Sequence, residues 1–388
     1  MYTLTLIYDR SQKDSIVRAS LIENWLSEPR NRDVLKTQKP RHVDIHEPLT
    51  QTDIAIHIDT PVYSAIPWAF SNVLVKNPEK WSSVYATYEP AYDAVISISV
   101  SESFDGLNGI KIALATIPLR KPQHGNHACP PILDISQCPP ISVITPTYNR
   151  RKLLQIAFHN LMATDYPRDK IEWVVVEDNE NQENMASDMI LGFQVNNPSV
   201  KFKYIPLSGR HSIGYKRNIG VEHASNDIIL FMDDDDHYPV TSFRRRVAWL
   251  TKSIRKNINI ACCTTIAMYN LQTGQSAVNV PPWDIALSKR VSEATLTFFK
   301  SAWVMRKFPD KSESEGDDWI DGRELSVIEI PPQQIIVAFN HGENDKRRKI
   351  PETAPVGCFW NFPKEYLQFI HGLVGVEIVE EKQKKRGK

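Results

Sequence analysis

The segment 227–236, DIILFMDDDD, constrains the fold of this chain more than any other stretch. Four consecutive carboxylates repel one another, so a stable fold needs a reason to hold them together. The apolar run directly before them is typical of a strand buried on both faces, as in a parallel sheet covered by helices. Ligands bind at the carboxyl ends of such strands. The segment therefore predicts an α/β fold with an acidic site at the edge of its sheet.

Residues 141–345 alternate between strand-like and helix-like patterns, which predicts that they form one α/β domain around this acidic strand. The segment 150–166 carries Leu154, Ala157, Phe158 and Leu161 on one stripe, and the segment 171–178 is almost continuously apolar. We expect strands at 141–148, 171–178, 201–207 and 227–232, and helices at 150–166 and 214–224.

Residues 1–120 show the same alternation and predict a second α/β domain, with a Rossmann-like parallel sheet. The expected strands are 3–8, 53–59, 92–100 and 110–119, and the expected helix is 14–28. No GxGxxG follows the first strand, so nothing here indicates dinucleotide binding. We expect a non-catalytic domain that serves acceptor binding or assembly. A proline-rich linker over 121–140 separates the domains, and a C-terminal helix and charged tail occupy 346–388.

The overall composition excludes several classes of protein. The 388 residues include 46 Lys and Arg and 46 Asp and Glu, and a formal charge of zero argues against a general nucleic-acid binder. No apolar stretch approaches the roughly 20 residues that span a bilayer. Five cysteines without CxxC spacing indicate reduced thiols, so we expect a soluble cytoplasmic protein. The spacing of His124, His127, Cys129 and Cys138 fits no standard zinc site.

Hard divalent cations prefer several oxygen ligands, so the aspartates at 233–236 predict a Mg²⁺ or Mn²⁺ site that bridges to a diphosphate. The alternative is a solvated acidic loop. His341 follows the strand-like IIVAF and could add a nitrogen ligand for Mn²⁺, although a single histidine is more often structural. The EF-hand pattern of alternating acids and a glycine is missing.

Four further segments carry candidate binding groups. In TPTYNR, Tyr148 offers a flat face for a base, or else packs on the core. In Glu177-Asp178-Asn179 an acid could bind a base or ribose, or else form a turn. The helix start GYKRNIG presents cations to a diphosphate, or else is an ordinary surface helix. In GDDW, a carboxylate of Asp317 or Asp318 could accept the proton of a hydroxyl, or else lie in a polar loop.

The order ISVITPTYNR, VVVEDN, GYKRNIG, ILFMDDDD, GDDW resembles the GT-A fold glycosyltransferases of family 2 over residues 141–345. The resemblance implies an inverting, metal-dependent glycosyltransferase of the hexosyltransferase type. Its D-x-D motif falls on Asp233, Asp234 and Asp235, with Asp235 as the preferred metal ligand and Asp233 or Asp234 serving the ribose or the metal. The implied nucleotide-binding residues are Pro146, Thr147, Tyr148, Asp178, Lys216, Arg217, Asn218, Asp233 and Asp234; the implied metal ligands are Asp235, Asp233 and His341.

The same resemblance implies that Asp318 is the catalytic base. An Asp replaces the family's usual Glu at position 317, so the roles of Asp317 and Asp318 could be exchanged. The implied cofactor is Mn²⁺ or Mg²⁺, the donor a UDP-sugar, and the acceptor a glycan or glycoconjugate. The Q-x-x-R-W signature of processive members is absent, which favours transfer of a single sugar.

Two alternative functions remain at this stage. A nucleotidyltransferase would also combine a nucleotide, a divalent ion and paired acids, but TPTYNR lacks the glycine-rich phosphate loop expected for it. The second alternative is a catalytically inactive GT-A-like module that binds glycans or partner proteins. The N-terminal domain itself resembles a degenerate half of a GT-B enzyme, as in glycosyltransferases of large DNA viruses, which would place the protein in the host cytoplasm.

Overall fold

The computed structural model describes residues 1–376 with internal gaps. The residues outside this description are 46–51, 63–68, 82–84, 86–88, 90–91, 100–105, 107, 113–131, 253–256, 280, 282–284, 331, 333, 343–349, 353, 355, 359, 361 and 377–388. The candidate zinc residues His124, His127 and Cys129 fall among them, as does most of the expected linker. Among the described residues, no helix is both long enough and apolar enough to cross a membrane.

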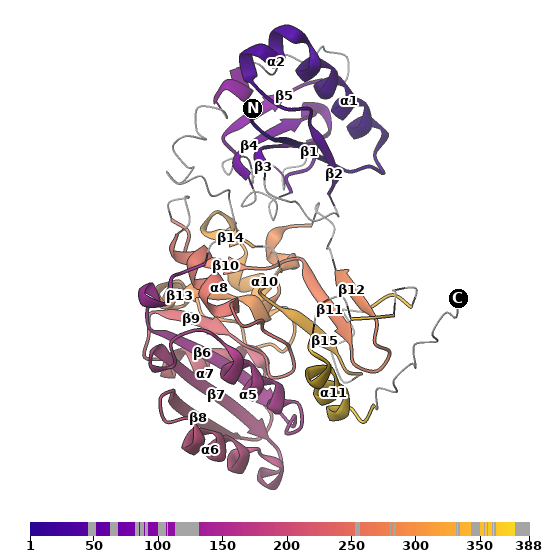
Figure 1. Cartoon of the computed structure of the whole chain (residues 1–388). Helices are drawn as coiled ribbons and strands as arrows, with labels where there is room; N and C mark the ends of the chain where they lie inside the picture. The colour runs from indigo at the N-terminus through magenta and orange to yellow at the C-terminus, as the bar shows by residue number, and fades with distance from the viewer. Residues whose placement is uncertain are drawn as a thin grey trace, which may run out of the picture.

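The N-terminal part forms a five-stranded sheet whose paired strands all run parallel, in the order β2-β1-β3-β4-β5 (Figure 1). This is a doubly wound order, and it confirms the expected Rossmann-like layer. The strands are β1 (Leu4–Tyr8), β2 (Arg41–Asp44), β3 (Thr52–Ile58), β4 (Ala69–Lys76) and β5 (Ala94–Ser97). Helices α1 (Lys13–Ser27) and α2 (Pro29–Leu35) connect β1 to β2.

The strand expected over 110–119 was wrong where the structure describes it, because residues 108–112 are helical. In a strand, Ile110 and Ile112 would share one face. Ile110 is instead fully buried in the N-terminal core, whereas Ile112 is 52% exposed. Within the described residues 108–112, the chain is therefore a helix in which Ile110 faces the core and Ile112 does not.

The C-terminal part is built on a seven-stranded mixed sheet, in the order β14-β10-β13-β9-β6-β7-β8 (Figure 1). Strands β9, β6, β7 and β8 run parallel, and β13 is antiparallel to both β9 and β10. The strands are β6 (Ile141–Tyr148), β7 (Ile171–Asn179), β8 (Lys201–Ser208), β9 (Ile228–Phe231), β10 (Ile260–Cys262), β13 (Thr297–Phe299) and β14 (Val327–Glu329). A smaller sheet pairs β12 (Ser276–Asn279), β11 (Ile266–Asn270) and β15 (Val337–Asn340).

Strand β7 shows why its sequence is continuously apolar. Trp173 and Val175 join the core on one face of the sheet, and Val174 and Val176 join the core on the other. Successive side chains of a strand point to opposite faces, so a strand covered on both sides needs apolar residues throughout. The covering helices are α5 (Leu154–Ala163), α6 (Ser187–Asn196), α7 (Ile213–His223), α8 (Ser242–Thr251), α9 (Lys300–Met305) and α10 (Glu315–Ile320); α11 (Lys364–Leu373) packs by the smaller sheet.

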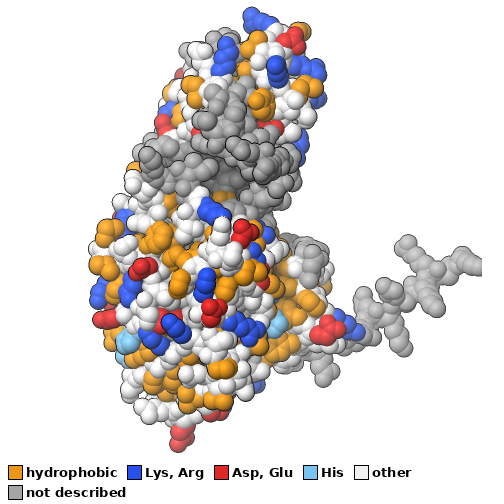
Figure 2. All heavy atoms as spheres, turned by 60° about the vertical axis from the view of Figure 1, so that its left-hand side comes forward, with side chains coloured by type: hydrophobic (Ala, Val, Ile, Leu, Met, Phe, Trp, Pro, Cys, Tyr) orange, Lys and Arg blue, Asp and Glu red, His pale blue; other side chains and the backbone are white. Residues whose placement is uncertain are grey.

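The surface agrees with the zero formal charge of the chain. On the face that Figure 2 shows, acidic and basic side chains of the described residues are interspersed rather than gathered by sign. Sequence-independent binding of nucleic acid requires a continuous basic surface, and this face has none among its described residues.

Close packing of α7 on the sheet depends on Gly220. A Cβ at this position would lie 2.4 Å from Cγ2 of Ile144 on β6, far inside van der Waals contact. We expect Gly220→Ala to lower the free energy of unfolding by about 1–3 kcal/mol, the usual cost of overpacking. The matched control is Gly192→Ala in α6, where a Cβ meets nothing within 4 Å and alanine should stabilise the helix by up to about 1 kcal/mol. Urea unfolding of both variants checks this, and equal stabilities would contradict it.

Candidate active site

The carboxyl ends of β9, β6 and β7 lie side by side because these three strands are parallel neighbours in the sheet. Strand β6 ends at Tyr148, Asp178 lies at the end of β7, and Asp233 follows β9 after one intervening residue. The next residue after β6, Asn149, has a φ of +50°, a left-handed conformation that asparagine tolerates better than most side chains. This edge of the sheet therefore gathers three of the sequence segments that were singled out above.

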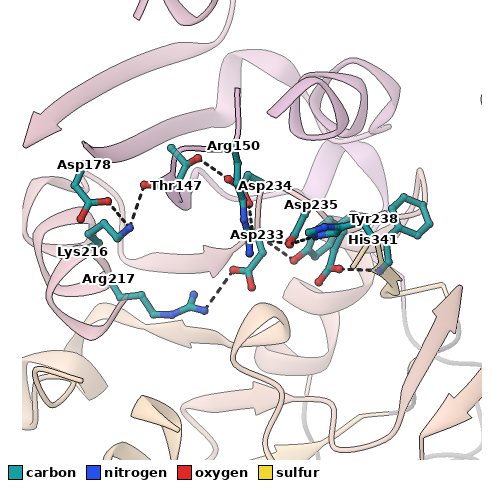
Figure 3. A network of polar contacts seen from close by, with 12 residues as sticks. Thr147, Arg150, Asp178, Lys216, Arg217, Asp233, Asp234, Asp235, Tyr238 and His341 are labelled. Carbon is teal, nitrogen blue, oxygen red and sulfur yellow. Dashed lines mark hydrogen bonds and ion pairs between the residues drawn. The ribbon is translucent and has the colours of Figure 1, made fainter. Parts of the chain in front are cut away.

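The four consecutive aspartates differ in their partners, although Asp234 and Asp235 share Arg150 (Figure 3). Asp233 accepts a hydrogen bond from Arg217 at 3.3 Å. Asp234 accepts from Thr147 Oγ1 at 2.5 Å and from Arg150 at 3.1 Å. The two other acids also contact the segment at and directly after β15.

Asp235 Oδ2 lies 2.5 Å from Arg150 Nη1 and 3.0 Å from His341 Nε2. Asp236 Oδ1 accepts a hydrogen bond from the backbone N–H of Phe339 on β15, at 3.0 Å. The smaller sheet thus fixes the second half of the acidic run, and the end of β6 fixes the middle. Distributing the partners in this way lets four adjacent carboxylates coexist in a folded chain.

The two central aspartates differ in how readily they hold a proton. Burial raises the pKa of Asp234 to about 6, against the opposing attraction of Arg150. Burial would also raise the pKa of Asp235, but Arg150 and the hydrogen bond from His341 together lower it to about 2. Asp235 is therefore the member of the pair that stays ionised over the whole physiological range, as a cation ligand must.

Asp178 is completely buried, and its carboxylate binds the ammonium of Lys216 at 2.6 Å. It also accepts a hydrogen bond from the backbone N–H of His211 at 2.5 Å. Lys216 reaches on to the carbonyl oxygen of Thr147 at 3.0 Å, so the lysine ties the ends of β6 and β7 together. The adjacent Glu177 is also buried, but it binds the Ala186 N–H and the Tyr204 hydroxyl, so it belongs to the packing around β8.

A cavity of about 200 Å³ opens at this end of the sheet, next to Tyr148. The Arg210 guanidinium lies over the tyrosine ring, with Cζ 4.8 Å from the ring centroid. His211 stacks on Tyr215 beside it, at a centroid distance of 4.9 Å. The residues that line the cavity are Pro146, Thr147, Tyr148, Arg150, Arg210, His211, Ile213, Lys216, Arg217, Asp233, Asp234 and Ser312. An aromatic face beside cations and a carboxylate suits a nucleotide.

A second cavity, of about 340 Å³, adjoins the first and shares Arg150, Arg217 and Asp233 with it. Asp235 and Asp236 face this cavity, together with acids from later in the chain: Glu293, Glu313, Glu315 and Asp317. Lys289 and Arg290 lie on its wall as well. The shared residues mark the point at which a ligand that fills both cavities would have to pass.

Arg217 occupies this junction and is 2% exposed. Its Nε donates to Glu315 at 2.8 Å and its Nη2 to Asp233 at 3.3 Å, whereas its Nη1 is buried and has no hydrogen-bond partner among the described residues. A buried donor on a charged group is costly to leave unsatisfied. An anionic group bound at the junction would satisfy it.

Four expected site residues line neither cavity. Asp178 and His341 bind Lys216 and Asp235, which do line one, whereas Asn218 and Asp318 lie further away. The side-chain amide of Asn218 donates to the backbone oxygen of Phe308 and accepts from the backbone N–H of Phe308. It also accepts from the Trp303 indole, so Asn218 holds the loop after α9. Asp318 carries a 65% exposed side chain and pairs with Lys311 at 2.7 Å. It is the adjacent Asp317 that lines the second cavity, because consecutive residues of α10 point in different directions.

Sequence reasoning missed Glu315, the first residue of α10. Burial raises its pKa to about 7, against the attraction of Arg217 and with the help of Glu293. Its position directly before GDDW was the available signal. It was missed because an acid that follows KSES looks like part of a charged loop. Sequence reasoning also assigned no role to Arg150, although it lies inside TPTYNR, or to Glu293, whose neighbouring residues form no recognisable motif.

The pKa of Glu315 predicts a pH dependence of stability. Between about pH 4.5 and 7 the folded protein retains a proton on Glu315 that the unfolded chain has released, so the free energy of unfolding falls as the pH rises through this window. We expect Glu315→Gln to remove on the order of 1–3 kcal/mol of this fall. Urea unfolding at pH 5 and pH 8 measures it. An unchanged difference between the two pH values in the variant would refute the assignment.

The donor set around Asp235 can be tested for a divalent cation. A carboxylate oxygen and an imidazole nitrogen 3.0 Å apart are ligand types that Mn²⁺ accepts. Within the described parts of the chain, no group of three or more His, Cys, Asp and Glu side chains is arranged as a complete metal site. Asp235 and His341 therefore fit a cation that takes its remaining ligands from a substrate or water, provided that Arg150 moves off Asp235.

Comparison with known proteins agrees with this geometry. Residues 142–311 match the family model described as Glycosyl transferase family 2. A GalNAc(5)-diNAcBac-PP-undecaprenol beta-1,3-glucosyltransferase of Campylobacter jejuni is 28% identical over 98 residues, which are 25% of this chain and 30% of the relative. Poly(ribitol-phosphate) beta-N-acetylglucosaminyltransferase TarS of Staphylococcus aureus is 27% identical over 109 residues, 28% of this chain and 18% of that protein. The chain thus spans less than a third of the length of these curated relatives.

Solved structures give similar matches. Mannosyltransferase PcManGT from Pyrobaculum calidifontis, in complex with GDP-Man and Mn²⁺, has a TM-score of 0.41 and 21% identity, covering 56% of this chain and 60% of that chain. TarS 1–349 of S. aureus, in complex with UDP-GlcNAc, has a TM-score of 0.37 and 17% identity, covering 52% of this chain and 58% of that chain.

Proposed function

Because residues 142–311 form a glycosyl transferase family 2 domain, we propose that this protein transfers a single sugar from a nucleoside-diphosphate sugar to an acceptor hydroxyl. The observation that carries the proposal is the pair of adjoining cavities that meet at Asp233 and Arg217. The smaller cavity suits the nucleotide, and the larger one suits the sugar and the acceptor. UDP is the proposed nucleotide, and the acceptor is a glycan or glycoconjugate.

The nucleotide would enter beside Tyr148, with its base against the ring that Arg210 now covers. Asp178 and Lys216 hold the ends of β6 and β7 rigid beneath it. The diphosphate would then lie at the junction, where Nη1 of Arg217 offers a buried donor without a partner in the described chain. Preorganised donors of this kind stabilise charge that develops on a leaving group.

Asp235 and His341 are the residues that would hold a divalent cation, Mn²⁺ or Mg²⁺. Such a cation, when bound, neutralises negative charge on a diphosphate leaving group. Asp233 lies beside it at the junction and is engaged by Arg217. This assignment keeps Asp235 and His341 of the three metal ligands predicted from the sequence, and it leaves the third, Asp233, to Arg217.

The proposed reaction is a direct displacement with inversion. The acceptor oxygen forms a bond to C1 of the sugar, the bond from C1 to the phosphate oxygen breaks, and its electron pair leaves with the diphosphate. The hydroxyl proton passes to the carboxylate of Asp317, which faces the second cavity. Asp318, the base that the family resemblance implied, is placed outside this cavity beside Lys311.

We assign the catalytic unit to residues 141–345, after a linker at 121–140 and before a C-terminal segment at 346–388. The N-terminal unit, 1–120, is proposed to be non-catalytic. Both cavities are lined by residues of the C-terminal unit alone, which supports this division.

A screen of nucleotide sugars tests the proposal. Purified protein is incubated with UDP- and GDP-sugars, with and without Mn²⁺, and release of the nucleoside diphosphate is measured. Slow hydrolysis of one donor, dependent on Asp317, is the expected result. Release of inorganic diphosphate from a nucleoside triphosphate would indicate a nucleotidyltransferase instead. UDP binding by calorimetry without hydrolysis of any donor, even with a glycan library present, would indicate an inactive binding module.

A further inference from the structure

The guanidinium of Arg150 lies where a cation would be expected to bind. Its Nη1 is 2.5 Å from Asp235 Oδ2 and 3.1 Å from Asp234 Oδ1, so one nitrogen bridges the two acids (Figure 3). The same Asp235 oxygen is 3.0 Å from His341 Nε2. Arg150 therefore occupies the Asp235 oxygen that, together with His341, fits a divalent cation.

The two acids need a counter-charge whenever no metal is bound. Asp234 is 1% exposed and Asp235 is 6% exposed, and buried carboxylates without a partner are strongly unfavourable. Two other buried cations of the site are engaged elsewhere: Lys216 holds Asp178, and Arg217 holds Asp233 and Glu315. In the structure this role falls to Arg150.

A guanidinium and a metal ion cannot occupy the same side of one carboxylate oxygen. Arg150 is able to move, because its side chain is 30% exposed and it lines both cavities. On leaving Asp235, the guanidinium would enter the junction of the two cavities, which Arg217 also lines. This is where the diphosphate is proposed to lie. An arginine fork matches the geometry of phosphate oxygens.

We propose that Arg150 is an exchangeable counter-ion, which neutralises Asp234 and Asp235 in the metal-free protein and is displaced from Asp235 when a divalent cation binds. The released guanidinium then binds the diphosphate of the donor. The inference rests on the proposed function, since it assumes a nucleoside-diphosphate ligand. It makes metal and nucleotide binding cooperative, because the nucleotide stabilises the arginine in its displaced position and, by linkage, each ligand raises the affinity for the other equally.

The test is calorimetric titration of Mn²⁺ alone into the full-length wild type, Arg150→Met and Arg151→Met, each with and without UDP. Methionine keeps much of the side-chain volume and removes the charge. Arg151 is the matched control, because it is the next residue but pairs with the exposed Asp188 away from both cavities. A buried charge-assisted contact is worth roughly 10- to 100-fold in an equilibrium constant, which sets the size of the expected effects.

We expect Arg150→Met to bind Mn²⁺ alone about 10- to 100-fold more tightly than the wild type, with a smaller enhancement by UDP. Arg151→Met should match the wild type within about twofold. A melting experiment gives a readout independent of binding: in EDTA, Arg150→Met should melt below the wild type, and Mn²⁺ should raise its melting temperature by more than it raises that of the wild type.

Two results would overturn the exchange and are distinct from failure of the proposed function. Equal Mn²⁺ affinity in wild type and Arg150→Met would show that the arginine does not compete with the metal, even if donor hydrolysis is normal. Sugar transfer by wild type in EDTA would show that Arg150 is a permanent substitute for the metal. Failure of every donor in the hydrolysis screen would instead refute the enzyme itself.

Discussion

Replacing Asp317 by asparagine is expected to lower the rate of sugar transfer by about 10³-fold while leaving UDP affinity within about twofold of the wild type. Two carboxylates of α10 face the larger cavity, those of Glu315 and Asp317. Glu315 is committed to Arg217 at 2.8 Å and is held deep in the site, so it is poorly placed to collect a proton from an incoming acceptor. Initial rates with a donor from the screen, and calorimetry with UDP, measure the two quantities.

Asp318→Asn provides the control within the same helix. Its carboxylate is 65% exposed and pairs with Lys311, and an exposed pair of this kind contributes little to stability or catalysis. We expect its transfer rate to stay within about threefold of the wild type. A large loss in Asp318→Asn together with normal transfer by Asp317→Asn would reverse the assignment. The base would then be the residue that the family resemblance implied.

Asp235→Asn should abolish the effect of Mn²⁺ on donor binding. The substitution keeps the shape of the side chain but removes the charge that faces His341 and Arg150, and a neutral amide is a poor ligand for a divalent cation. We expect UDP affinity in EDTA to be similar to that of the wild type, whereas the gain on adding Mn²⁺ should fall by about 10- to 100-fold. Calorimetry of UDP with and without Mn²⁺ gives both values.

Asp188→Asn is the control for this charge removal, because Asp188 is exposed and pairs only with Arg151 among the contacts described here. It should behave as the wild type in both titrations. A full Mn²⁺ effect in Asp235→Asn would mean that the cation is held by other groups, and Asp233 would be the next residue to test.

The sequence predicted the strands and the gathered ends of β6, β7 and β9 because these depend on local patterns. A short apolar run that is rich in β-branched residues, such as WVVV in β7, favours a buried strand, and polar residues at the ends of parallel neighbours lie at one edge of the sheet. The helix α5 was equally readable, since Leu154, Ala157 and Leu161 recur with helical spacing and are buried. These features needed no knowledge of distant contacts.

The remaining parts of the site depend on contacts between distant segments. Whether Asp317 or Asp318 faces the cavity is decided by the rotation of a six-residue helix, and that rotation is set by packing of Trp319 against Phe308 and Phe298. Arg150 and Asp235 are 85 positions apart, and Arg217 and Glu315 are 98 apart. Nothing in the residues around them indicates the pairing. The misread strand near 110 failed for a related reason, since both periodicities fit a run of so few apolar residues.

The acidic run after β9 has a consequence for how this protein can tolerate change. Each of its four members has a partner in a different segment of the chain. In order, these partners lie in α7, at the end of β6, at the histidine after β15, and in the backbone of β15. The role of each aspartate is therefore set by its position in the run, and the total negative charge of the run is secondary. A single alanine inserted ahead of Asp233 would keep every acid and yet shift each one away from its own partners, so we expect it to be as damaging as neutralising the whole set.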